Sequence, residues 1–75
     1  MVELSEQLLV DLGFSQFRVR IHGNVARIEV LPEDLFRLLE NRERIVAGLK
    51  DYGFSYVAMD LEGYRTGSMN EVIIH

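Results

Sequence analysis

The 75-residue sequence contains no cysteine and only two histidines. Without cysteine the chain has no disulfide bond and no thiolate zinc site, and this indicates a reducing compartment, which we expect to be the cytoplasm. His22 and His75 are too few to suggest a metal centre. No apolar run approaches the roughly 20 residues of a membrane span, and the N-terminus lacks the basic and apolar regions of a signal peptide. We therefore expect no contact with a membrane.

Several functional motifs are missing as well. The sequence has no Gly-Lys-Ser/Thr phosphate loop and no Ser-His-Asp or Cys-His set, so we expect no catalytic residue in the chain and no activity from the chain alone. A formal net charge of -4 argues against a broad basic surface for nucleic acid. The apolar content of 48% is enough for a packed core, and the length predicts one small domain, residues 1–75.

Two stretches show helical periodicity. The first is predicted to begin at Ser5, a residue type favoured at the N-cap, and to end at Gly13. The second begins at Pro32, which suits a first helical position, and ends at Gly53. Asn41 lies in the middle of this second stretch and predicts a break near residues 40–41.

Alternating or continuous apolar residues predict the strands. These are 17–22 and 25–30, then 54–62, which is apolar on both faces as a central strand would be, and a short last strand at 71–74. The echo of "DLGFS" (11–15) in "DYGFS" (51–55) suggests two similar helix–strand junctions. The predicted fold is an α+β two-layer sandwich in the order α-β-β-α-β, with a small mixed sheet and both helices on one face.

The stretch "FRVRIHGNVARIEV" (17–30) predicts a β-hairpin with a two-residue turn at Gly23-Asn24. A turn of that length fixes the register, so that Arg20 lies opposite Arg27 and Arg18 lies opposite Glu29. Alternation then separates two faces. The core face holds Phe17, Val19, Ile21, Ala26, Ile28 and Val30. The other, here called the arginine face, holds Arg18, Arg20, His22, Val25, Arg27 and Glu29.

Two cross-strand pairs on the arginine face have opposite effects. Arg18 and Glu29 are expected to form an ion pair, whereas Arg20 opposite Arg27 is a destabilising like-charge pair. In one interpretation both guanidiniums turn into water or reach Asp60 or Glu62. In the other, the arginines bind a phosphate or carboxylate, because guanidinium holds such anions in a bidentate fork. His22 would add a donor at the edge of that site.

The stretch "DLEGYRTGSMN" (60–70) places polar side chains among glycines, a composition that lets a loop approach an anion closely. As a bare pattern it is equally typical of an ordinary turn. The candidate ligand contacts in this stretch are Asp60, Arg65, Ser68 and Asn70.

Taken together, "LGFSQFRVRIHGNVARIEV", "PEDL" and "GFSYVAMDLEGYRTGSMNE" closely resemble the C-terminal domain of one enzyme family. This is the LarE family of ATP-dependent sacrificial sulfur transferases, which are PP-loop ATP pyrophosphatases. The resemblance covers roughly residues 12–71. Its elements are Arg-x-Arg-x-His before the hairpin turn, Ala-Arg-Ile-Glu after it, and Asp-Leu-x-Gly-Tyr-Arg-x-Gly-Ser-Met-Asn at the end.

The resemblance implies a division of labour. In the family, an N-terminal PP-loop domain binds ATP with Mg and adenylates a nicotinate-derived mononucleotide, while arginines of the C-terminal domain hold a phosphate group and the domain aids assembly. The first two arginines of the Arg-x-Arg-x-His element correspond here to Arg18 and Arg20, which favours the anion-site interpretation. The sequence lacks both the Ser-Gly-Gly-x-Asp-Ser loop and the cysteine of some members. The implied partners are therefore a PP-loop ATPase domain, in cis or in trans, a phosphate-bearing small molecule and further copies of the chain. A purely structural docking module and a free-standing small-anion-binding protein are the alternatives.

Overall fold

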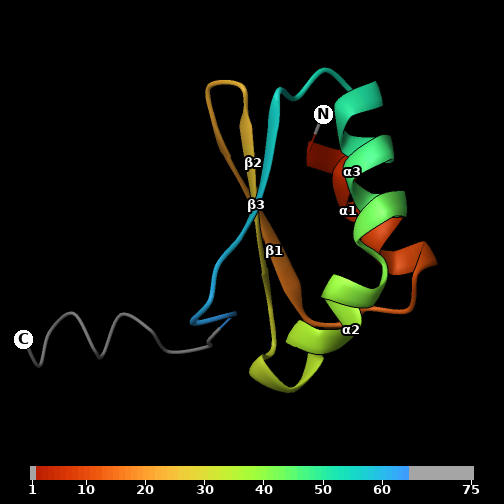
Figure 1. Cartoon of the computed structure of the whole chain (residues 1–75), viewed down its shortest axis with the longest axis vertical. Helices are drawn as coiled ribbons and strands as arrows, with labels where there is room; N and C mark the ends of the chain where they lie inside the picture. The colour runs from red at the N-terminus through yellow and green to blue at the C-terminus, as the bar shows by residue number, and fades with distance from the viewer. Residues whose placement is uncertain (1, 65–75) are drawn as a thin grey trace, which may run out of the picture.

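The structure is a computed structural model that describes residues 2–64. The helices and strands follow the predicted order (Figure 1). They are α1 (Val2–Asp11), β1 (Phe17–His22), β2 (Val25–Val30), the short 3-10 helix η1 (Pro32–Asp34), α2 (Leu35–Glu40), α3 (Arg42–Asp51) and β3 (Tyr56–Met59). The predicted strand at 71–74 lies outside the described residues.

The sheet is mixed, as predicted. Its strand order is β1-β2-β3, with β1 and β2 antiparallel and β2 and β3 parallel. Figure 1 shows the helices on one side of this sheet, which confirms the two-layer α+β arrangement. The prediction that 54–62 forms the central strand is wrong, because β2 pairs with both neighbours and β3 pairs with β2 alone among the described residues. The described helices cover only one face of the sheet, which explains the error: charged residues on the other face are accommodated even on the central strand.

The helix–strand junctions repeat one hydrogen-bonded motif. After α1, the Gly13 amide donates to the Val10 carbonyl (2.9 Å) and the Phe14 amide donates to the Leu9 carbonyl (3.1 Å). After α3, Gly53 donates to Lys50 (3.0 Å) and Phe54 donates to Leu49 (3.2 Å). Both are Schellman motifs, which require a positive φ at the glycine, and the values are 97° at Gly13 and 110° at Gly53. The echo in the sequence therefore corresponds to two equivalent junctions.

The start of α1 differs from its prediction. The helix begins at Val2, so Ser5 is an interior residue of the helix and not its N-cap. The Ser5 side chain is fully buried, at 0% exposure. A small side chain suits a buried position inside a helix, and such a position gives the same sequence signal as a cap.

The predicted break near 40–41 is confirmed, since α2 ends at Glu40 and α3 begins at Arg42. The Asn41 side chain makes no cap bond to α3. Its Nδ2 donates instead to the Arg37 carbonyl, at 2.8 Å, and so satisfies the carboxyl end of α2.

The core lies between the helices and the covered sheet face. Its buried members come from every layer: Leu9, Phe14, Val19, Ala26, Ile28, Val30, Leu38, Ile45, Leu49 and Phe54. Four of them belong to the core face predicted for the hairpin. Alternation then directs the arginines of the same two strands to the side without helices.

Candidate functional site: the arginine face of the sheet

The hairpin register determines where the arginines lie. All six predicted pairs are present, from Phe17 opposite Val30 to His22 opposite Val25, with Arg20 opposite Arg27. At the turn, Gly23 has a φ of 59°, in the left-handed region that a two-residue hairpin turn requires. The sequence prediction of a common arginine face is therefore confirmed.

A carboxylate separates the two opposed arginines. Oε2 of Glu29 lies 3.5 Å from Nε of Arg20 and 3.3 Å from Nη2 of Arg27. The Glu29 side chain is only 11% exposed, whereas those of Arg20 and Arg27 are 47% and 39% exposed. Glu29 thus lies beneath the two guanidiniums, where it offsets the like-charge repulsion that the register imposes.

Arg27 has a second acidic neighbour. Its Nε lies 3.8 Å from Oδ2 of Asp60, which follows β3 directly. This nitrogen is buried and donates no hydrogen bond among the described residues. The ion pair between Arg27 and Asp60 therefore links β2 to the end of β3. This agrees with the interpretation of the sequence in which the guanidiniums reach Asp60 or Glu62. Asp60 itself is held in place, because its Oδ1 accepts a hydrogen bond from the Glu62 amide at 2.9 Å.

Arg18 has a different environment, and its predicted ion pair with Glu29 is wrong. Among residues 2–64, Arg18 forms no ion pair with a carboxylate. Its guanidinium carbon lies 5.8 Å from the centre of the Tyr64 ring, a cation–π contact. Glu29 is instead drawn to the opposed pair, where one carboxylate relieves the repulsion of two cations.

Gly63 gives Tyr64 its position beside Arg18. The Tyr64 amide donates to the Val30 carbonyl at 2.6 Å, so the chain after β3 returns to the end of β2. Gly63 is buried, with a φ of 82°, and a Cβ there would lie 2.5 Å from the same Val30 oxygen. Only glycine permits this approach.

His22 lies at the tip of the hairpin, on the same face as Arg18 and Arg20. Residues at i and i+2 of a strand are about 6.5 Å apart, so these three side chains form a row along β1. Of the candidate contacts after β3, the structure places Asp60 next to Arg27. Arg65, Ser68 and Asn70 lie outside the described residues.

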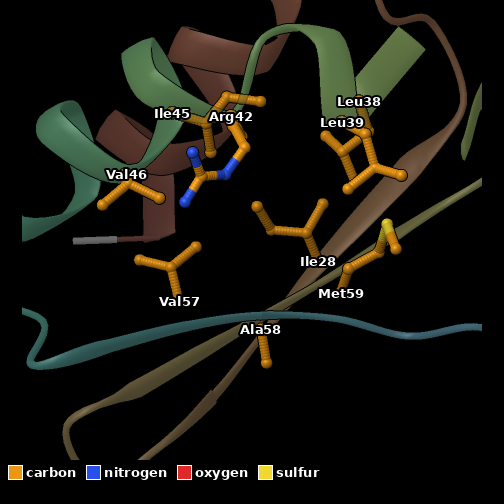
Figure 2. A pocket seen from close by; sticks show the side chains of 9 residues that line it. All are labelled: Ile28, Leu38, Leu39, Arg42, Ile45, Val46, Val57, Ala58 and Met59. Carbon is orange, nitrogen blue, oxygen red and sulfur yellow. The ribbon is translucent and has the colours of Figure 1, made fainter. Parts of the chain in front are cut away.

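A pocket of about 200 Å³ lies on the opposite, helix-covered side of the sheet (Figure 2). Figure 2 shows the Arg42 guanidinium pointing into it between Val46 and Val57, while Ala58 points away. Apart from Arg42, the lining is apolar: Ile28, Leu38, Leu39, Ile45, Val46, Val57, Ala58 and Met59. Because the sheet separates the two, this pocket contributes nothing to the arginine face.

Comparison with known proteins gives the chain its relatives. The pyridinium-3,5-bisthiocarboxylic acid mononucleotide synthase of Lactiplantibacillus plantarum is 39% identical over 72 residues, which are 96% of this chain and 26% of the synthase. The matched part of the synthase is its C-terminal region. The chain is similar to the C-terminal region of this LarE-family synthase. This confirms the resemblance that the sequence motifs indicated.

Two uncharacterised proteins are also similar to this chain. A protein of Synechocystis sp. is 39% identical over 92% of this chain, and one of Methanocaldococcus jannaschii is 37% identical over 87%. The chain spans about a quarter of each of the three relatives, at 26%, 26% and 25% of their lengths. No protein-family model matches the chain. Among the described residues, no helix has the length and apolar character needed to cross a bilayer.

The sequence prediction did not find the contacts that two residues make with the arginines. It assigned Glu29 to Arg18, although Glu29 serves Arg20 and Arg27. It also gave Tyr64 no partner, although Tyr64 contacts Arg18. The sequence did contain a signal for the position of Glu29. The register places Arg20 opposite Arg27, and such a like-charge pair needs a nearby carboxylate.

Proposed function

We propose that the chain is the auxiliary C-terminal domain of a PP-loop ATP-dependent sulfur transferase, and that Arg18 and Arg20 bind a phosphate group of its substrate. One observation carries the phosphate site: Arg18 has no carboxylate partner among the described residues and lies beside Arg20 on the sheet face that none of the described helices covers. The relative from Lactiplantibacillus plantarum is by name a synthase of a mononucleotide, a compound class that carries phosphate.

Geometry supports Arg18 and Arg20 above Arg27. The first two are neighbours on β1, about 6.5 Å apart, so one phosphate between them can accept hydrogen bonds from both guanidiniums. Arg27 is held by two carboxylates, those of Glu29 and Asp60. His22 continues the row along β1 and would meet the part of the substrate beyond the phosphate.

The chemistry would come from the rest of the protein. The chain spans about a quarter of its relatives' length and has neither the PP-loop motif nor a cysteine, so ATP, Mg and the sulfur source would bind elsewhere. In this proposal the complete enzyme acts in the cytoplasm and the arginine face closes over its substrate's phosphate.

Titration with inorganic phosphate tests the site. We expect the Nε–Hε NMR signals of Arg18 and Arg20 to shift with a Kd of about 1 mM at low ionic strength, equivalent to about 4 kcal/mol. Arg18→Gln should weaken binding at least fivefold, and Arg18→Lys should weaken it too, because an ammonium lacks the bidentate fork. The matched control is Arg44→Gln, on the exposed surface of α3. Equal affinity of the Arg18 and Arg44 variants would reject the site.

A role in assembly has its own supporting observation. Large apolar side chains are exposed outside the core, with Phe36 at 80%, Leu61 at 77% and Tyr56 at 66%. Such residues are typical of a surface that another domain or another copy covers. Sedimentation of the Phe36→Ser variant and of the unchanged chain tests this. If the chain self-associates through α2, its sedimentation coefficient should rise with concentration, and the variant should lose that dependence. Identical profiles would reject self-association through α2.

A further inference from the structure

We propose that Glu29 is an internal competitor for the anion site: it occupies Arg20 and Arg27 when no ligand is bound and lowers the affinity for doubly charged anions. This inference rests on the proposed phosphate site. It adds a role for Glu29, which contacts no ligand in that proposal and which the sequence analysis paired with Arg18.

The first argument is the position of the carboxylate. A single oxygen, Oε2 of Glu29, lies within 3.5 Å of both guanidiniums. Because the Glu29 side chain is only 11% exposed, water screens these contacts less than it screens an ion pair between two exposed side chains, although the guanidiniums themselves are partly exposed. Glu29 therefore occupies the place between Arg20 and Arg27 where an external anion would otherwise relieve their repulsion.

The second argument is the charge of the site. The three arginines Arg18, Arg20 and Arg27 and the two carboxylates of Glu29 and Asp60 together carry a net charge of +1. A phosphate dianion exceeds that charge, whereas a monoanion matches it. Since Arg20 is shared, its phosphate ligand must also lie close to the Glu29 oxygen and be repelled by it.

The third argument concerns order. Two arginines directly opposite each other on adjacent strands would turn apart without a counter-ion between them. Glu29 holds Arg20 on the side of Arg27 in the unliganded chain, and Arg18 is held separately by Tyr64. Binding of phosphate then requires two changes. The phosphate contacts Arg18, whose guanidinium forms no ion pair with a carboxylate among the described residues, and Arg20 moves away from Glu29.

Removal of the Glu29 charge provides the test. In Glu29→Gln the site gains one unit of net positive charge, and repulsion between Glu29 and a dianion some 6–7 Å away is lost, so phosphate at pH 8 should bind about tenfold tighter. Acetate, a monoanion, should gain only about threefold at matched ionic strength. The matched control is Asp60→Asn, which removes a carboxylate 3.8 Å from Arg27 but leaves Arg20 unchanged, and it should alter phosphate affinity less.

The outcomes separate the two proposals. If the unchanged chain binds phosphate and Glu29→Gln binds it no more tightly, the competitor role is rejected and the phosphate site stands. If neither chain shifts the Arg18 signal with phosphate, both proposals fail.

A measurement on the unchanged chain covers the case in which Glu29→Gln does not fold. The carboxyl ¹³C signal of Glu29 should move together with the Arg20 Nε–Hε signal as phosphate saturates the site, because the ion pair between them is disrupted. A Glu29 signal that stays constant while Arg20 responds would overturn the inference.

Discussion

Gly63→Ala is the sharpest test of how the site is built. Gly63 has a φ of 82°, and a Cβ at this position would lie 2.5 Å from the Val30 carbonyl oxygen, a main-chain atom that no side-chain rotation can move away. An L-residue in the left-handed region costs about 1–2 kcal/mol. Disruption of the hydrogen bond between the Tyr64 amide and the same oxygen adds about 1–2 kcal/mol. The expected loss is therefore about 3 kcal/mol.

That loss is large for a chain of this size. A domain of 75 residues has a free energy of unfolding of about 4–11 kcal/mol. Since 1 kcal/mol shifts Tm by about 4–8 °C in small domains, Gly63→Ala should lower Tm by roughly 10–20 °C. Circular dichroism melts, with urea unfolding as a second measure, give the value. Because Tyr64 is also displaced from Arg18, phosphate affinity should fall in the same variant.

Gly23→Ala is the matched control. Gly23 also has a positive φ, 59°, but a Cβ there meets nothing within 4 Å. It should cost about 1–2 kcal/mol, the backbone term alone. The difference between the variants isolates the contact with Val30. If both lower Tm by the same amount, the close approach of Gly63 to β2 does not contribute to stability and the reasoning is refuted.

Three further outcomes are expected. Arg20→Ala should change Tm by only a few degrees in phosphate-free buffer, because it removes both the repulsion by Arg27 and an ion pair that is half exposed. The same variant should abolish the rise in Tm that phosphate produces. An equal drop in Tm with and without phosphate would make Arg20 purely structural. Asn41→Ala should cost about 1 kcal/mol in urea unfolding through loss of the 2.8 Å bond to the Arg37 carbonyl, and an unchanged midpoint would show that water replaces it. The purified chain should release no pyrophosphate from ATP in a coupled assay, and turnover that follows the protein through purification would contradict the assignment of ATP binding to the rest of the enzyme.

The hairpin was predictable because a two-residue turn permits only one register, and because the alternation of side chains along a strand then determines which residues share each face. Its six pairs and both its faces follow from Gly23-Asn24 alone. The ion pairs were not predictable in the same way, since register gives only the residue directly opposite, and Glu29 reaches Arg20 diagonally and Arg27 along its own strand. Side-chain reach and local repulsion decide such contacts, and neither is visible as periodicity.

The errors at Ser5 and β3 have related physical causes. A serine before an apolar stripe suits an N-cap, but it equally suits a buried position inside a helix, and here packing decides. Apolar residues on both faces suggested a central strand at 54–62. In β3, however, Val57 and Met59 line the pocket, while Tyr56 is 66% exposed on a strand that pairs with β2 alone among residues 2–64. Exposed apolar residues on an uncovered sheet thus imitate the composition of a buried strand.

The parallel pairing of β2 with β3 has a consequence for folding. The β1–β2 hairpin is local and can form on the microsecond timescale of isolated hairpins, whereas the pairing of Val25 with Tyr56 closes a chain segment that contains η1, α2 and α3 and is therefore expected to form later. Arg20, Arg27 and Glu29 belong to the early hairpin. Asp60 and Tyr64, which complete the surroundings of Arg27 and Arg18, arrive with the late strand. In folding kinetics, we therefore expect the ratio of the change in activation free energy to the change in stability (the φ-value of a mutation) to be higher for Ile28→Val than for Val57→Ala. The arginines would then be aligned before the segment that restrains them, and a phosphate present during refolding would meet the hairpin before the sheet is closed.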